Sequence, residues 1–284
     1  MTRLLRDLWR ICKADKAALV GGAIVALFVL IAVVGPWIAH VNQNANPANA
    51  YAAPSLADPL GTDFLGHSVL AEIIVGTRPI MEVGIFASLI TVFVGVTVGL
   101  AAGYVGGAAD AIAMRVVDIF LTIPGLPLII VIASIISTTN PFVLAAILSV
   151  TTWAGLARAI RSQALSLRSI AFVEAARVQG LPVRHMVFRE LLPNVGPYIA
   201  INFLLDVNVA IYAEVGLFIL GVAPITGNNW GVMINLALGN GALYTTSSML
   251  YLFAPIAAIV ILQVAFVFFS RALDQLFNPQ LRVR

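Results

Sequence analysis

The chain has 284 residues, of which 61% are hydrophobic and only 10% are charged, and its mean hydropathy is +1.00. Soluble domains carry about 25% charged residues, so this chain has too few polar side chains to cover a water-facing surface. The composition therefore excludes a soluble protein and indicates an integral membrane protein. The net charge of +3 does not point to nucleic acid, because basic residues in membrane proteins commonly mark topology.

Six apolar runs are each long enough, or nearly so, to cross a hydrocarbon layer of about 30 Å as a helix. They predict an all-α integral membrane protein with helices over 17–39, 83–105, 116–138, 141–157, 195–222 and 249–270. The first run is longer than the apolar core of a signal peptide, so we interpret it as a retained helix. Because no internal repeat occurs, residues 17–284 are treated as one transmembrane domain.

The distribution of Lys and Arg predicts the orientation. If the N-terminus is cytoplasmic, 15 of the 16 basic residues fall in the cytoplasmic segments, which are 1–16, 106–115, 158–194 and 271–284. Only Arg78 lies on the other side. Cytoplasmic loops carry an excess of basic residues, so both termini are expected in the cytoplasm. Residues 40–82 then form an outer loop, and residues 158–194 form a cytoplasmic coupling loop.

The chain carries no recognisable catalytic motif. Its only lysines are Lys13 and Lys16, and it has no G-x-x-x-x-G-K-[ST], H-E-x-x-H or G-x-S-x-G sequence. We therefore predict no catalytic residue, no metal site and no cofactor in this chain. His40 and His67 share the outer side, and two ordinary loop residues are a better interpretation than a pair of metal ligands.

The cytoplasmic segment 172–194, FVEAARVQGLPVRHMVFRELLPN, has the pattern of two short helices. The first helix is expected to end at Gly180, a natural C-terminal stop. The second is expected to open with Pro182 in its first turn and to close before Pro193. Two helices that meet at an angle form a rigid elbow, and residues 172–194 are called the elbow below.

The start of the elbow is suited to contact with another surface. Glu174 lies where its charge suits the helix dipole, and Ala175 and Ala176 keep one side thin enough for another protein to approach. From the residues alone, an amphipathic connector lying on lipid headgroups is an equally good interpretation.

The order and spacing of Glu174-Ala175-Ala176, Gly180 and Leu192-Pro193 resemble the EAA loop of ABC importer permeases. In such permeases this loop is the coupling helix, which docks in a groove of the ATPase subunit. The resemblance implies that these residues couple the chain to an ATPase, and that the chain is a transport subunit without its own motor.

Other stretches resemble the dipeptide, oligopeptide and nickel group, specifically its C-type permease subunit. One is the outer-loop run from Leu60 to Gly66, LGTDFLG. There the chain has His67-Ser68 where the group has Arg-Asp, and Glu72 where the group commonly has Arg. The remaining stretches are, in chain order, Gly103–Gly107, Asp110 with Met114, Arg115 and Asp118, Glu214 with Leu217–Gly221, Trp230-Gly231, and Leu273-Asp274 with Asn278–Arg282.

The resemblance implies the function and the partners. The chain is expected in the cell membrane as one of two homologous permease subunits, with two ATPase subunits and an extracytoplasmic binding protein as its other partners. Solute would move by alternating access driven by ATP. Di- or oligopeptides are the substrates that the resemblance favours, with nickel chelates and oligosaccharides as alternatives.

Three polar residues of the predicted fifth span, Asn202, Asp206 and Glu214, fall on roughly the same helix face. A charge at a helix centre costs about 2.5–3.5 kcal/mol, so such residues usually face a bundle interior or a watery cavity. One interpretation is that they line the translocation path. A structural hydrogen-bond network between helices is equally good.

Smaller patterns predict local structure. Gly95, Gly99 and Gly103 form a ridge without side chains that lets another helix approach closely, in this chain or in a second permease. Near the turn between the second and third predicted helices, the charged residues Asp110, Arg115 and Asp118 are expected to form local ion pairs. The uncharged segment 223–248 is either a re-entrant or surface helix or a plain connecting loop.

Two other classes of protein are alternatives to an importer subunit. An ion-coupled secondary transporter or channel would use Asp206 and Glu214 as coupling sites, and the chain alone would transport. A membrane-embedded enzyme would need a nucleophile or a metal cluster, which the motifs do not supply. Co-purification discriminates among the three classes, because only the importer requires an ATPase and a second permease.

Overall fold

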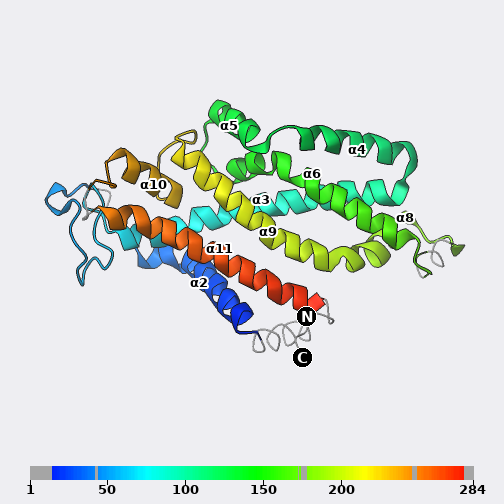
Figure 1. Cartoon of the computed structure of the whole chain (residues 1–284), viewed down its shortest axis with the longest axis horizontal. Coiled ribbons are helices and arrows are strands. Elements are labelled where there is room, and N and C mark those ends of the chain that lie inside the picture. Colours follow the sequence, from blue (N-terminus) through cyan, green and yellow to red (C-terminus); the bar gives the residue numbers. More distant parts are fainter. Residues whose placement is uncertain (1–14, 42–43, 172, 174–177, 245–247, 278–284) are drawn as a thin grey trace.

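The computed structural model describes residues 15–41, 44–171, 173, 178–244 and 248–277. All regular elements in these residues are helical, and most helices follow the long axis of the molecule (Figure 1). The long helices are α2 (Lys16–Ile38), α3 (Val69–Val105), α4 (Gly107–Thr122), α5 (Gly125–Ile136), α6 (Pro141–Arg168), α9 (Leu192–Ile219), α10 (Trp230–Gly239) and α11 (Met249–Phe277). The short pieces are η1 (Pro47–Asn49), α8 (Val183–His185) and η2 (Met186–Leu191).

Five helical stretches of the described chain are long and apolar enough to cross a membrane, or six if the bent pair α4 and α5 counts as one span. The prediction of an all-α membrane protein is therefore confirmed. The third span, expected as a single helix over 116–138, is instead broken by an 84° bend between α4 and α5. The bend follows from Pro124, because proline disfavours the helical conformation of the residue before it, and Ile123 is extended.

The second span begins earlier than the expected residue 83. Helix α3 begins at Val69, so the non-helical part of the outer loop ends at Ser68. Two charges, Arg78 and Glu82, interrupt the apolar run and conceal this part of the helix in the sequence. They lie one turn apart, and Arg78 Nε is 2.8 Å from Glu82 Oε1, so their charges compensate each other on the helix surface.

The elbow does not close before Pro193 as expected. From Met186 to Leu191 the chain forms a π-helical turn, and it runs directly into α9, which begins at Leu192. A proline inside an α-helix lacks the N–H that bonds to the carbonyl four residues earlier. A π turn changes this bonding pattern, and Pro193 occupies the first turn of α9, where a missing N–H is tolerated.

The glycine ridge of α3 packs against α6 of the same chain. A Cβ atom built on Gly99 would lie 2.5 Å from the Ala157 carbonyl oxygen and 2.8 Å from Ile160 Cβ. Gly95 and Gly103 meet the same helix one turn to either side. The predicted close approach is confirmed, and its partner is the fourth predicted span.

Replacing Gly99 with alanine is expected to destabilise the fold by about 1–3 kcal/mol, because the new methyl group would overlap backbone atoms of α6. Thermal unfolding of the purified chain in detergent measures the effect. Gly155→Ala on α6 is the matched control, since a Cβ there meets no atom within 4 Å in the part of the chain that the structure describes. An equal fall in the unfolding midpoint for both variants would contradict the packing account.

The aspartates of α4 pair with arginines of α6 and not with Arg115 as the local ion-pair prediction implied. Asp110 accepts two bonds from Arg161, at 2.5 and 2.6 Å, and Asp118 pairs with Arg158. Because α6 extends beyond residue 157 to Arg168, its last turns carry these arginines as helix residues. The pairs fasten α4 along α6.

The segment 223–248 contains helix α10, so the interpretation as a helix is confirmed over a plain loop. Trp230, its first residue, is fully buried, and its indole Nε1 donates to the Ile73 carbonyl oxygen of α3 at 3.0 Å. The ring also meets Phe28 of α2 edge to face at 5.8 Å between centroids. Helix α10 is thereby fixed against α2 and α3.

The described ends of the chain lie together. Asp15 caps α2 by accepting from the N–H of Ala17, and its other carboxylate oxygen accepts from the Gln275 side chain of α11 at 3.0 Å. Burial alone would raise the pKa of the Asp15 carboxyl, but bonds from Ala18, Gln275 and Ala17 outweigh it and lower this pKa. The start of α2 and the end of α11 therefore lie side by side.

Candidate functional site

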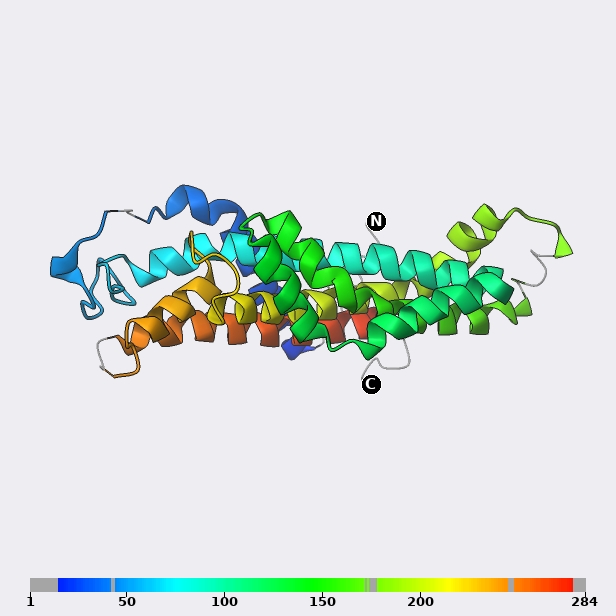
Figure 2. The same cartoon turned by 90° about the horizontal axis from the view of Figure 1, so that it is seen from above.

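The described parts of the elbow and of the outer loop lie at opposite ends of the long axis in both views (Figures 1 and 2). The start of α2 and the end of α11 point toward the end that carries the elbow (Figure 1). Among the elbow residues predicted to couple to an ATPase, Glu174, Ala175 and Ala176 lie outside the described residues. Gly180, Leu192 and Pro193 are described.

The turn of the elbow is built on Gly180. Its φ angle is +71°, a left-handed conformation that favours glycine, as expected at a helix stop. Pro182 then caps the short helix α8, which opens the second arm as predicted. Leu192 and Pro193 are the first two residues of α9, so the elbow passes straight into the fifth predicted span.

Two buried side chains anchor the second arm. Met186 and Leu191 are both fully buried. Met186 packs with Tyr104 at the end of α3, and Leu191 packs with Leu100 of α3 and Ile160 of α6. Since these contacts involve two long helices, the arm has a fixed position relative to the bundle.

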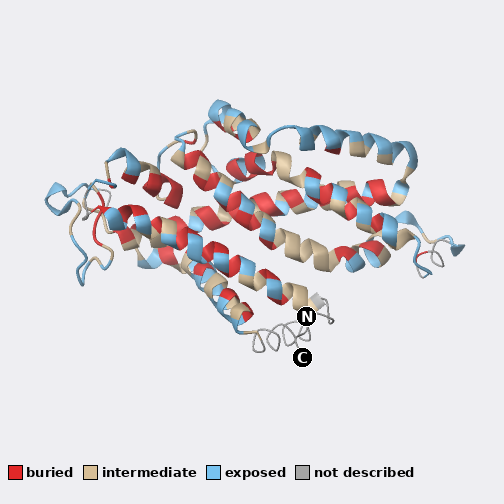
Figure 3. Cartoon of the chain, viewed as in Figure 1, coloured by how far each residue is buried: buried red, intermediate tan, exposed pale blue. Residues whose placement is uncertain are grey.

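The other side of the elbow is exposed and carries apolar and basic side chains. Val178 is 83% exposed, Val183 56% and Phe188 60%. Beside them lies an open hollow of about 630 Å³, and its lining residues are Pro182, Arg184, His185, Phe188 and Arg189. Figure 3 shows much of this end of the molecule as exposed. Exposed apolar side chains rimmed by polar ones mark interaction sites, so this face of the elbow is suited to docking.

The structure does not bring the three polar residues of α9 into contact with one another. Asn202 donates to the Tyr198 carbonyl oxygen of its own helix at 2.8 Å. Asp206 is partly exposed, and its Oδ2 atom has no hydrogen-bond partner among the described residues. Glu214 is 1% exposed and accepts from the Asn229 side chain at 2.8 Å.

Asn229 is the residue of this network that sequence reasoning missed. Its Nδ2 atom donates to Glu214 of α9, and its Oδ1 atom accepts from the N–H of Gly231 at 2.8 Å, which caps α10. Asparagine before an apolar run is a helix-start signal, but the sequence does not reveal that its amide also reaches α9. Glu214 and Asn229 also line a hollow of about 290 Å³ beside Pro79 and Thr139.

These features define a multi-pass helical membrane protein with an exposed, anchored elbow at one end. Residues 95–283 match the family described as binding-protein-dependent transport system inner membrane component. Residues 3–57 match the N-terminal TM domain of oligopeptide transport permease C. The chain therefore belongs to this family of inner membrane permeases, as the resemblance implied.

Sequence similarity to individual permease proteins supports the same family. Over 283 residues the chain is 32% identical to the dipeptide transport system permease protein DppC of Bacillus subtilis (strain 168), an alignment that covers 98% of this chain and 86% of that protein. It is 29% identical to the oligopeptide transport system permease protein OppC of the same organism, over 95% of this chain and 88% of the relative. It is 30% identical to the glutathione transport system permease protein GsiD of Pectobacterium atrosepticum, over 98% and 91% of the two chains.

Proposed function

We propose that this chain is one of two homologous permease subunits of an ABC importer that takes up di- or oligopeptides. Two separate ATPase subunits supply the energy, and an extracytoplasmic binding protein delivers the solute. This chain contributes the path and the coupling elbow and performs no catalysis itself. The observation that carries the proposal is the exposed elbow, anchored on α3 and α6 and continuous with α9, in a chain of this permease family.

The geometry supports mechanical coupling. Because Leu191 is buried against α3 and α6, the elbow cannot swing freely on a loose hinge. A force on its exposed face, at Val183 or Phe188, passes through the π turn into α9. Closure and reopening of an ATPase dimer would thus shift α9 back and forth against its neighbours. The path would then open alternately to each side of the membrane.

The proposed orientation places the elbow and both termini in the cytoplasm. The adjacency of Asp15 and Gln275 supports a common side for the two termini. The basic side chains of the elbow, Arg184 and Arg189, support the cytoplasm as that side, because cytoplasmic loops are enriched in Lys and Arg.

The substrate class rests on the relatives, whose names specify dipeptides, oligopeptides and glutathione. All three are short peptides, so we assign peptides to this chain as well. Specificity is expected to lie largely in the binding protein, because the candidate membrane spans carry few charged residues that could recognise a peptide.

Co-expression with the neighbouring transport subunits tests the proposal. The purified chain should carry a second permease and an ATPase, and proteoliposomes should import a radiolabelled dipeptide only with ATP and the binding protein. Peptide uptake by the chain alone, driven by an ion gradient, would instead assign it to the secondary transporters.

Neutralising Asp206 tests whether α9 lines the path. Asp206→Asn keeps the size of the side chain, so the subunits should still assemble with the ATPase while peptide uptake falls several-fold. Asn202→Ala is the companion variant, and Leu205→Ala on the exposed flank of α9 is the control. Loss of assembly in Asp206→Asn would favour the structural network over the path.

A further inference from the structure

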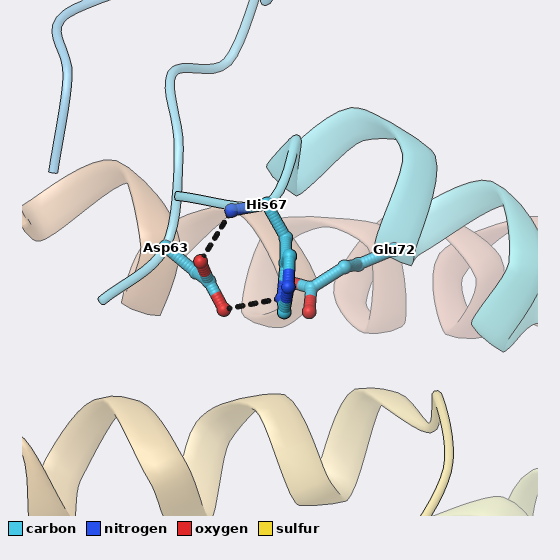
Figure 4. Close-up of side chains that lie close together, drawn as sticks. All are labelled: Asp63, His67 and Glu72. Atoms are coloured by element: carbon cyan, nitrogen blue, oxygen red, sulfur yellow. Dashed lines mark hydrogen bonds and ion pairs between the residues drawn. The ribbon is translucent and has the colours of Figure 1, made fainter. Parts of the chain in front are cut away.

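Three side chains that can bind a metal ion converge where the outer loop meets α3. Asp63, His67 and Glu72 each offer one ligand atom, and these atoms lie within 4.8 Å of one another. Figure 4 shows Asp63 beside the imidazole of His67 and the carboxylate of Glu72 directed toward the same ring from the first turn of α3. This cluster lies far from the elbow and outside the residues assigned to the path.

The cluster is buried and contains polar atoms without partners. Asp63 is 1% exposed and Glu72 7% exposed. Among the described residues, Glu72 Oε2 and His67 Nε2 have no hydrogen-bond partner although both atoms are buried. An unsatisfied buried polar group costs about 1–3 kcal/mol, and more when it is charged. The side chains therefore have ligand atoms that the protein itself does not use.

The cluster combines two acidic side chains with one imidazole. Within the described chain, Asp63 lies against His67, whose Nδ1 is 3.3 Å from Asp63 Oδ2. Buried charges in proteins are paired or coordinate metals, so a divalent cation would compensate this site.

The backbone already holds the loop ligands in place. Asp63 Oδ1 accepts from the N–H of Leu65 at 2.9 Å and of His67 at 2.6 Å, and the Asp63 N–H donates to the His67 carbonyl at 2.9 Å. Gly66 closes this turn at a φ of +84°, where a Cβ would lie 2.4 Å from the Asn46 carbonyl oxygen. A preformed turn loses little conformational entropy when it binds an ion.

We propose that Asp63, His67 and Glu72 bind one divalent transition-metal ion of the zinc class, which fastens the outer loop to the first turn of α3. Zinc takes imidazole nitrogen and carboxylate oxygen at about 2.0–2.2 Å, which places tetrahedral donors roughly 3.4 Å apart. The ligand atoms lie within 4.8 Å of one another, so they need to approach by at most roughly 1.4 Å. Magnesium and calcium prefer oxygen ligands and do not suit the imidazole. Water completes the coordination.

Zinc binding to the full-length chain in lipid nanodiscs tests the proposal, with a purification tag that contains no histidine. After EDTA treatment, the wild-type chain should bind about one Zn²⁺, and Zn²⁺ but not Mg²⁺ should raise its thermal unfolding midpoint. His67→Gln and Glu72→Gln should each lower the zinc affinity at least about tenfold. His40→Gln is the matched control, because this second histidine of the outer side is exposed.

The result that overturns the proposal is a wild-type chain that takes up no zinc or that responds equally to Zn²⁺ and Mg²⁺. Unchanged zinc affinity in His67→Gln would overturn it as well. The unfolding midpoints in EDTA show whether each variant folds like the wild type. If neither variant folds, the stoichiometry and the metal selectivity of the wild-type chain decide the question.

Discussion

Replacing Gly180 with valine is expected to reduce ATP-dependent peptide uptake by about tenfold or more. Gly180 holds a φ of +71°, and forcing a β-branched residue into this region costs about 1–3 kcal/mol. A valine would therefore shift the turn between the two arms of the elbow and misplace its exposed face. Uptake into proteoliposomes and the ATPase activity of the assembled complex both measure the effect.

Asparagine at the same position is the matched control. Asparagine tolerates the left-handed conformation better than other non-glycine residues, and no atom of the described residues lies within 4 Å of a Cβ built on Gly180. Gly180→Asn should therefore retain most of the uptake. Equal losses in both variants would mean that something other than the backbone conformation matters at this position.

Replacing Asn229 with alanine is expected to destabilise the chain by about 2–4 kcal/mol, the largest effect on folding among the variants considered. The variant loses the cap of α10, which contributes about 1 kcal/mol. It also leaves the carboxyl group of Glu214 buried without its bond, which costs about 1–3 kcal/mol. A fall of several degrees or more in the thermal unfolding midpoint would be the signature.

Asn240→Ala is the comparison variant for Asn229→Ala. Asn240 lies at the other end of α10 and is exposed, and its side-chain amide donates to the Leu236 carbonyl oxygen of the same helix. Its loss should shift the midpoint little. If Asn229→Ala is as stable as Asn240→Ala, the contact between Glu214 and Asn229 does not hold α10 in place.

Patterns that are local in the chain were predictable from the sequence. Apolar run lengths indicated the spans because a helix must satisfy its backbone within the bilayer. The spacing of Gly95, Gly99 and Gly103 indicated a close helix contact, because a side chain at these positions would clash with α6. Gly180 indicated a helix end, because its backbone adopts a positive φ angle that favours glycine. The predicted helix boundaries were wrong where a local sequence pattern was misleading. Pro193 has the pattern of a helix end, and the pair Arg78 and Glu82 has the pattern of a loop.

Contacts between distant segments were not predictable. Asp110 and Arg161 are 51 residues apart, and only the packing of α4 on α6 brings them together. Similarly, His67 and Glu72 stood out in the sequence as departures from the pattern of the group, but their convergence with Asp63 depends on the turn before α3. Sequence periodicity describes one helix at a time, so it carries no information on which faces meet.

Site-specific crosslinking in intact cells tests the central claim most directly. The chain first loses its native cysteine through Cys12→Ser. In this background, Ala176→Cys should crosslink to the ATPase subunit. A cysteine at Leu56, which is fully exposed in the outer loop at the opposite end, should not. Crosslinks to the ATPase from Ala176 alone are the predicted result. Crosslinks from Leu56, or none from either position while peptide import continues, would contradict the account.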